Sequence, residues 1–115
     1  MKTKFTEIFR LRDMLDKAGI TYKYTDHSWE YKIDNIDYRR EHYHIEIFHP
    51  KNPTKRIISV IEGDGTYGNS KNLLEIMGCL TPEEAKDDCV CGWLTAENVF
   101  QRIKNALVGV ANERV

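Results

Sequence analysis

Apolar residues near the N-terminus recur at steps of three and four positions, which is the spacing of one face of an α-helix. The members of this pattern are Phe5, Ile8, Phe9, Leu11, Leu15 and Ala18. Gly19 follows directly, and glycine is the residue that most often ends a helix. The pattern therefore predicts an amphipathic helix that ends at Gly19.

From Ile20 the spacing changes to every second position, which is the pattern of a half-buried strand. Apolar and polar side chains alternate over residues 20–25 and again over residues 41–49, before Pro50 stops the second run. Residues 56–63 are rich in β-branched side chains, so the second and third runs predict an antiparallel hairpin. Residues 29–40 alternate only weakly, and we interpret them as an irregular hairpin.

The remaining pattern predicts a short helix, a polar turn, a strand and a final helix. The short helix is expected over residues 73–77, with Asn69 or Ser70 as its cap and Gly78 at its end. Residues 81–88 begin a turn or a single helical turn, and residues 89–94 form a short strand. Thr95 is a suitable N-cap for the last helix. Its apolar face consists of Val99, Phe100, Ile103, Ala106, Leu107 and Val110.

The predicted order of elements is α-β-β-β-α-β-α. Helices at both ends with hairpin-like strands between them favour an α+β fold, in which helices pack on one face of a small, mostly antiparallel sheet. The 115 residues are enough for a single core, so we expect one domain over residues 1–115. An apolar share of 41% with 30% charged residues is typical of a globular chain rather than a disordered one.

Charge and targeting signals narrow the class of protein. The net charge is −1, with 12 basic and 9 acidic residues up to position 56, and 5 basic and 9 acidic residues after it. This imbalance is far below that of an obligate nucleic-acid binder. We find no apolar signal region, membrane span or lipidation motif, and the three cysteines are an odd number. We therefore expect a cytoplasmic protein with free thiols.

Gly63, Gly65 and Gly68 have the spacing G-x-G-x-x-G of a dinucleotide-binding loop. That loop works only between a strand and a helix of a parallel βαβ unit, where phosphate rests on the helix N-terminus. The predicted context is different, and Asp64 places a negative charge where a phosphate would lie. We interpret the loop as a strand-to-helix turn and expect no cofactor.

Basic residues alternate with aromatic and histidine residues around the middle of the chain. Such a patch contacts a phosphate backbone or an acidic protein, although long basic side chains also simply cover the solvent face of a sheet. The candidate binding residues are Arg39, Arg40, His42, Tyr43, His44, Lys55, Arg56 and Lys71.

No catalytic motif is found, so we expect a protein that is not an enzyme. His42 and His44 would share one side of a strand, as would Cys89 and Cys91, and two nitrogen and two sulfur ligands suit tetrahedral zinc. The spacing is not that of a compact zinc motif, and solvent-facing histidines with core-facing cysteines explain the same residues. The acidic residues near position 85 are interpreted as a solvated loop.

The segment GNSKNLL resembles the start of the last helix in the double-stranded RNA-binding domain, where lysines reach phosphates across a groove. Gly68, Ser70 and Lys71 match that motif, and the resemblance extends over residues 5–78. The departures are Thr66 for a glycine and Asn72 and Glu75 for lysines. The resemblance implies a nucleic-acid-binding module in which Lys71 contacts phosphate. With the basic patch, the hypothesis is a module that uses Arg39, Arg40, Lys55, Arg56 and Lys71.

A second resemblance covers residues 73–107, LLEIMGCLTPEEAKDDCVCGWLTAENVFQRIKNAL. This segment is similar to short proteins encoded by phages and prophages of Gram-positive bacteria. The resemblance implies a bacterial host cell and a small non-enzymatic protein that binds a host protein or signal. Inhibition of a host defence system, as by anti-CRISPR proteins, is one form of that role. This is our leading hypothesis, with the nucleic-acid module as the alternative and with a monomer or homodimer both open.

Overall fold

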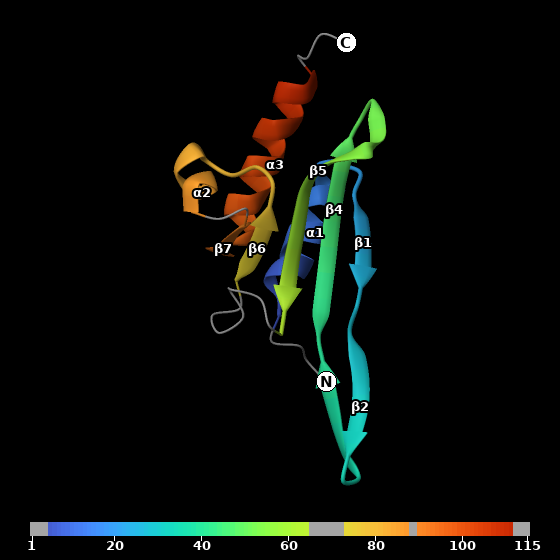
Figure 1. Cartoon of the computed structure of the whole chain (residues 1–115). Helices are drawn as coiled ribbons and strands as arrows, with labels where there is room; N and C mark the ends of the chain where they lie inside the picture. The colour runs from blue at the N-terminus through green and yellow to red at the C-terminus, as the bar shows by residue number, and fades with distance from the viewer. Residues whose placement is uncertain (1–4, 65–72, 88–89, 112–115) are drawn as a thin grey trace.

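The computed structural model describes residues 5–64, 73–87 and 90–111, and within these ranges it contains three helices and seven strands (Figure 1). The helices are α1 (Glu7–Lys17), α2 (Pro82–Asp87) and α3 (Ala96–Ala111). The strands are β1 (Lys23–Asp26), β2 (Trp29–Ile33), β3 (Ile36–Arg40), β4 (His42–His49), β5 (Asn52–Gly63), β6 (Leu74–Met77) and β7 (Val90–Leu94).

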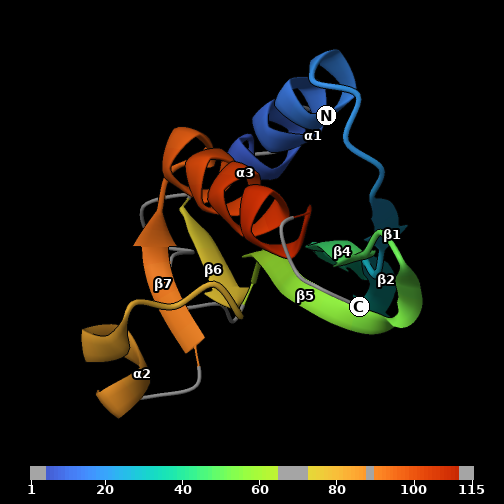
Figure 2. The same ribbon diagram turned by 90° about the horizontal axis from the view of Figure 1, so that it is seen from above.

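Five strands form one sheet in the order β1-β4-β5-β6-β7, and each neighbouring pair is antiparallel. Strands β2 and β3 form a separate two-stranded ribbon that extends beyond the sheet (Figure 1). Helices α1 and α3 lie together over one face of the sheet, and α2 lies beside β7 (Figure 2). This arrangement confirms the predicted α+β class with helices on one face of a mostly antiparallel sheet.

The core lies between the two long helices and the sheet. The apolar residues that recur every three or four positions in the helices pack there against those that recur every second position in the strands. Along β4 the burial alternates strictly, because odd-numbered side chains point toward the helices. The fully buried side chains from these layers include Phe5, Ile8, Leu11, Leu15, Ile45, Ile47, Ile58, Val60, Leu74, Ile76, Val99 and Ile103.

Helix α1 ends, and helix α3 begins, where the sequence predicts. Gly19 has φ +70° and donates its N–H to the carbonyl of Asp16, while Ile20 donates to Leu15, which is the glycine-terminated Schellman arrangement. At the start of α3 the Thr95 hydroxyl accepts the N–H of Asn98 at 3.2 Å, as an N-cap does. Local sequence signals therefore set these helix boundaries.

The segment expected as a short helix over residues 73–77 is instead strand β6, so that prediction is wrong. Leu74 and Ile76 are buried and alternate with the more exposed Glu75 and Met77, because β6 pairs with β5 on one side and β7 on the other. Tertiary pairing thus overrides a pattern that also fits a helix. The expected caps at positions 69 and 70 lie outside the described residues.

The glycine loop consequently joins two antiparallel strands, which excludes the parallel βαβ setting of a dinucleotide fold. Gly63 is the last residue of β5, and a Cβ there would lie 2.3 Å from the carbonyl oxygen of Glu41. Glycine is therefore required at position 63 by a close backbone approach. Gly65 and Gly68 lie outside the described residues.

Two buried glutamates hold the N-termini of the long helices. Glu62 of β5 is fully buried, and its Oε1 accepts the N–H of Ile8 at 2.8 Å, in place of Thr6, which makes no side-chain cap. Glu7 then accepts the N–H of Ala96, at the first turn of α3, at 3.2 Å. Removal from water raises the pKa of Glu62 to about 7.

We predict that Glu62→Gln changes the pH dependence of stability. An acid whose pKa rises on folding binds more protons in the folded state, so the wild-type free energy of unfolding falls as pH rises from 4.5 to about 7. This loss is at most about 3 kcal/mol. Glutamine keeps an acceptor for the α1 amide without a titratable group, so the variant gains stability relative to wild type across this window.

Urea unfolding at about pH 5 and pH 8.5 measures the difference. Glu83→Gln, at an exposed position of α2, is the matched control and leaves the pH profile unchanged. A stability difference between Glu62→Gln and wild type that is the same at both pH values would contradict the assignment.

Candidate functional site

Strands β1 to β4 form one continuous antiparallel ribbon. Paired residue numbers add to 69 both in the sheet, as for Lys23 and Glu46, and in the extension, as for Trp29 and Arg40. Between these ladders, His27 donates its N–H to the carbonyl of His42 at 2.8 Å, which is the same register. The extension, residues 29–40, is therefore a direct continuation of the sheet, and we call it the arm.

The junction between sheet and arm is held by hydrogen bonds at the residue that interrupts the strand. Asp64 donates its N–H to the carbonyl of Glu41 and accepts the Glu41 N–H with its carboxylate, both at 2.9 Å. The Ser28 hydroxyl accepts the N–H of His42 at 3.0 Å. These bonds fix how the arm leaves the sheet.

The tip of the arm is a tight turn rather than the irregular hairpin expected. Asp34 and Asn35 have φ of 51° and 64°, the positive values that a two-residue type I′ turn requires at both positions. All five residues of β2 pair with all five of β3, from Trp29 opposite Arg40 to Ile33 opposite Ile36. Residues 29–40 therefore form a regular hairpin, although apolar and polar residues alternate only weakly along them.

Because side chains alternate across a ribbon, the shared register places one set on a single continuous face. This face is the one that the helices leave uncovered within the sheet (Figure 2). We call it the open-face stripe, and from tip to sheet its members are Ile33, Ile36, Tyr31, Tyr38, Trp29, Arg40, His27, His42 and His44.

The arm half of the open-face stripe is a ladder of exposed aromatic rings. The rings of Tyr31 and Tyr38 stack with centroids 5.2 Å apart and planes at 12°, and Trp29 lies 4.7 Å from Tyr31. Trp29 is 53% exposed and Ile36 is 56% exposed. Large apolar side chains that gather on a protruding surface mark a contact site more often than chance exposure does.

The opposite face of the arm is charged and internally paired. Lys32 lies 3.6 Å from Asp37, and Arg39 lies 3.2 Å from Glu30, both across the ribbon. A second carboxylate, that of Glu41, lies 3.8 Å from Arg39. The arm is thus two-sided, with an apolar face and a charge-balanced face.

Three histidines occupy the stripe where the arm meets the sheet. The ring of His27 lies 5.9 Å from that of His42 and 5.8 Å from that of His44. Burial is the main cause that lowers the pKa of both His42 and His44, and repulsion from His27 adds to it. At neutral pH the rings of His42 and His44 are therefore aromatic rather than cationic.

His44 also belongs to a polar network on the same sheet face. Its Nε2 lies 2.6 Å from the Ser59 hydroxyl, and its Nδ1 lies 3.9 Å from the carboxylate of Glu46, which pairs with Arg56 at 3.2 Å. The order serine, histidine, carboxylate matches a catalytic triad. The 3.9 Å between His44 Nδ1 and the Glu46 carboxylate is, however, too long for the hydrogen bond that a triad requires. Ser59 is nearly buried in the middle of β5, so the network joins strands rather than facing a substrate.

The predicted basic patch is not one surface. Arg39 and Arg40 lie on opposite faces of the arm, and Arg56 is paired with Glu46 at the far end of the sheet. Tyr43 was expected on the surface and is instead 4% exposed, packed in the core against Phe9. Strand alternation explains this error, since odd positions of β4 face the helices.

The remaining predicted site residues lie as follows. His42 and His44 are on the open-face stripe, Lys55 is exposed at the start of β5, and Lys71 lies outside the described residues. Sequence reasoning missed Trp29, Tyr31 and His27 as site residues. The signal that reveals them is the Asp34-Asn35 turn, which fixes the ribbon register.

The postulated zinc ligands do not converge in the described part of the chain. Cys91 lies on β7, three strand spacings or about 14 Å from β4. Its thiol donates to Glu84 at 3.1 Å, and Glu84 in turn is held by Arg102 of α3 at 2.7 Å. Within the described ranges, no three potential ligands are grouped for a metal, and Cys89 lies outside them.

The chain matches no protein-family model, no curated protein and no solved structure. No helix in the described residues is long and apolar enough to cross a membrane. The candidate site therefore depends on its own geometry, and its main feature is the open-face stripe.

We predict that His42 and His44 titrate below the ordinary histidine pKa of 6.5. A histidine whose pKa falls on folding destabilises the fold when it is charged, so stability is lost as the pH falls below this value. NMR titration of the imidazole C–H signals measures each pKa, with the urea-unfolded chain as the reference. Values at or above the unfolded ones would contradict the packing of these rings.

Proposed function

We propose that the protein is a small non-enzymatic binding protein that docks onto a host protein through the open-face stripe. The observation that carries the proposal is the stacked ladder of Trp29, Tyr31 and Tyr38 on an arm that contributes nothing to the core. Binding energy at protein interfaces concentrates in aromatic anchors that become desolvated. A rigid hairpin presents such anchors with little entropy to lose.

The chemistry of the arm favours a protein over a nucleic acid. Single-stranded nucleic acids stack their bases on free ring faces, whereas Tyr31 and Tyr38 already stack on one another. The arm has three basic and three acidic residues, and four of these six form the ion pairs across the ribbon. Little unpaired positive charge is left for a phosphate backbone.

The resemblance of residues 73–107 to phage and prophage proteins supports a bacterial host cytoplasm as the setting. In that setting, the proposed partner is a host protein, and the proposed consequence is stoichiometric inhibition of a defence system of the anti-CRISPR kind. An apolar arm that occupies a groove of its target blocks that groove without any chemical step.

We predict that Trp29→Ser and Tyr38→Ser each weaken partner binding by about 30-fold or more, as loss of an interface anchor does. Affinity capture from the host lysate identifies candidates, and calorimetry with the purified partner then measures the dissociation constant. Lys32→Ser, on the charged face of the same arm, is the matched control. The ion pair between Lys32 and Asp37 is solvent-exposed and contributes little to stability or binding. The affinity of the Lys32→Ser variant for the partner therefore stays within a few-fold of wild type.

Equal affinities for Trp29→Ser, Lys32→Ser and wild type would contradict docking through the stripe. A partner that is a nucleic acid, with affinity falling steeply as salt rises, would replace the protein-binding proposal by the nucleic-acid module. Circular dichroism of each variant separates lost contacts from lost folding.

A further inference from the structure

The outer edge of the arm is a strand edge with no neighbouring strand in the described part of the chain. Strand β2 pairs with β3 on one side, and these two strands alone make up their sheet within the described residues (Figure 1). An unpaired edge presents a row of backbone N–H and C=O groups to another strand. Addition of a strand to such an edge is a recurring mode of protein recognition.

The register of the ribbon shows which backbone groups face outward. His27 donates its N–H inward, to the carbonyl of His42 at 2.8 Å. Because the backbone direction alternates along an antiparallel strand, the groups of residues 29, 31 and 33 also face β3. Those of Glu30 and Lys32 therefore face away from the ribbon, toward the position of a further strand.

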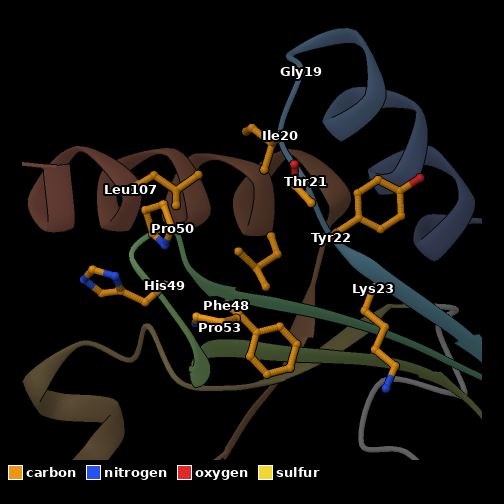
Figure 3. A pocket seen from close by; sticks show the side chains of 11 residues that line it. Gly19, Ile20, Thr21, Tyr22, Lys23, Phe48, His49, Pro50, Pro53 and Leu107 are labelled. Atoms are coloured by element: carbon orange, nitrogen blue, oxygen red, sulfur yellow. The ribbon is translucent and has the colours of Figure 1, made fainter.

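The free edge is confined to the arm. The N–H of Ser28 is already bonded, because it donates to the carboxylate of Asp26 at 2.8 Å. Beyond β1 the same edge runs into the α1–β1 connection, where Ile20 and Tyr22 line an apolar groove beside Leu107 (Figure 3). We therefore expect a further strand to pair with β2 alone.

The charges at the two outward-facing positions select a register for pairing with a second copy of β2. The side chains of Glu30 and Lys32 are 73% and 62% exposed. A two-fold axis through either residue would place like charges directly opposite each other, which destabilises a strand pair. An axis through Tyr31 instead places Glu30 of each copy opposite Lys32 of the other.

The register centred on Tyr31 also continues the charge pattern of the arm. Glu30 already pairs with Arg39, and Lys32 with Asp37, across the ribbon. One row of the four strands would thus read Arg39, Glu30, and then Lys32 and Asp37 of the second copy. The sign alternates at every step across this row.

The apolar face of the arm is matched in the same register. Tyr31 lies opposite Tyr31 of the second copy, and Trp29 lies opposite Ile33. Trp29 and Ile33 are 53% and 52% exposed in the single chain, and each would cover the other. Cross-strand pairs of aromatic and β-branched side chains are among those that stabilise a sheet.

The opposite edge of the arm, that of β3, matches a second copy less well. The corresponding register there, centred on Tyr38, places the cationic Arg40 opposite the apolar Ile36. The backbone of Glu41, the next outward-facing residue, is already bonded to Asp64. The β2 edge is therefore the self-complementary one.

We propose that the arm is a self-association element, in which two copies of the chain pair antiparallel through β2 to form a four-stranded ribbon with its two-fold axis at Tyr31. The occupant of the edge is a second copy because each match in charge and in apolar contact is between positions of β2 itself. The axis is normal to the ribbon, so both open-face stripes lie on the same side and remain uncovered. The pairing uses the strand edge rather than the face, and it does not rest on the docking proposal.

Sedimentation equilibrium of the full chain alone, up to about 1 mM, measures self-association in a range where weak dimers are populated. We expect a reversible monomer–dimer equilibrium. Isotope-filtered nuclear Overhauser spectra of mixed labelled and unlabelled chains then give the register, through contacts between Trp29 of one copy and Ile33 of the other. Within one copy these residues lie about 13 Å apart along the strand, too far for such a contact.

Charge variants test the register independently. Glu30→Lys and Lys32→Glu each place like charges opposite each other in a homodimer, so each weakens self-association about ten-fold. An equimolar mixture of the two variants restores opposite charges at every cross-copy pair and regains the wild-type affinity, which also shows that both variant arms are folded. Asp37→Lys is the matched control, because it breaks the same ion pair with Lys32 but leaves the β2 edge unchanged. Its self-association stays within a few-fold of wild type.

Several results would overturn the proposal. A wild-type chain that stays monomeric at the highest concentration would do so and would leave the edge to a strand of another protein. Equal dimerisation of Lys32→Glu and Asp37→Lys, a mixture of the charge variants that does not associate, or contacts between copies only outside the arm would do so as well. These measurements use the protein without a host partner, so their failure is distinguishable from failure of the docking proposal.

Discussion

The register of the β1–β4 ribbon is the constraint on which the rest of the structure depends. Because a strand alternates its side chains, the same ladder that turns Tyr24, Tyr43 and Ile45 toward the helices turns Trp29, Tyr31 and Tyr38 outward. A slip of one residue would exchange these two sets. The core and the open-face stripe are therefore two consequences of one pairing.

Three features hold this register along the length of the ribbon. The type I′ turn at Asp34-Asn35 fixes it at the tip, and the buried odd positions of β4 fix it in the sheet. Between them, Asp64 binds both backbone groups of Glu41, while Gly63 allows the close approach that this requires. Asp64, whose negative charge argues against a phosphate-binding loop, thus has a structural role at the junction of sheet and arm.

The helix layer is held on one face only, and this leaves the other face available. Glu62 and Glu7 accept the N–H groups at the starts of α1 and α3, which joins β5 to α1 and α1 to α3. A buried carboxyl stabilises these helix starts at the cost of its own desolvation, as the raised pKa of Glu62 indicates. Glu62 thus caps the start of α1, where the Thr6 side chain makes no capping hydrogen bond.

The sequence predicts an element correctly where the residues that determine it are neighbours along the chain. Periodicity and caps predict α1, α3 and the α+β class, because Gly19 and Thr95 act on their immediate neighbours. They fail at β6, where Leu74 and Ile76 fit a helix equally well until β5 and β7 pair with them. The basic patch fails for a related reason, since sequence does not show that Arg39 and Arg56 already pair with carboxylates.

The central claim is that the arm is folded in the free protein in the same register as the sheet. Cross-strand nuclear Overhauser contacts test it most directly, on a sample without partner. The structure predicts contacts between the rings of Tyr31 and Tyr38 and between those of His27 and His44, with slow exchange of the paired arm amides. Random-coil shifts and fast exchange throughout residues 29–40, with the sheet intact, would contradict it.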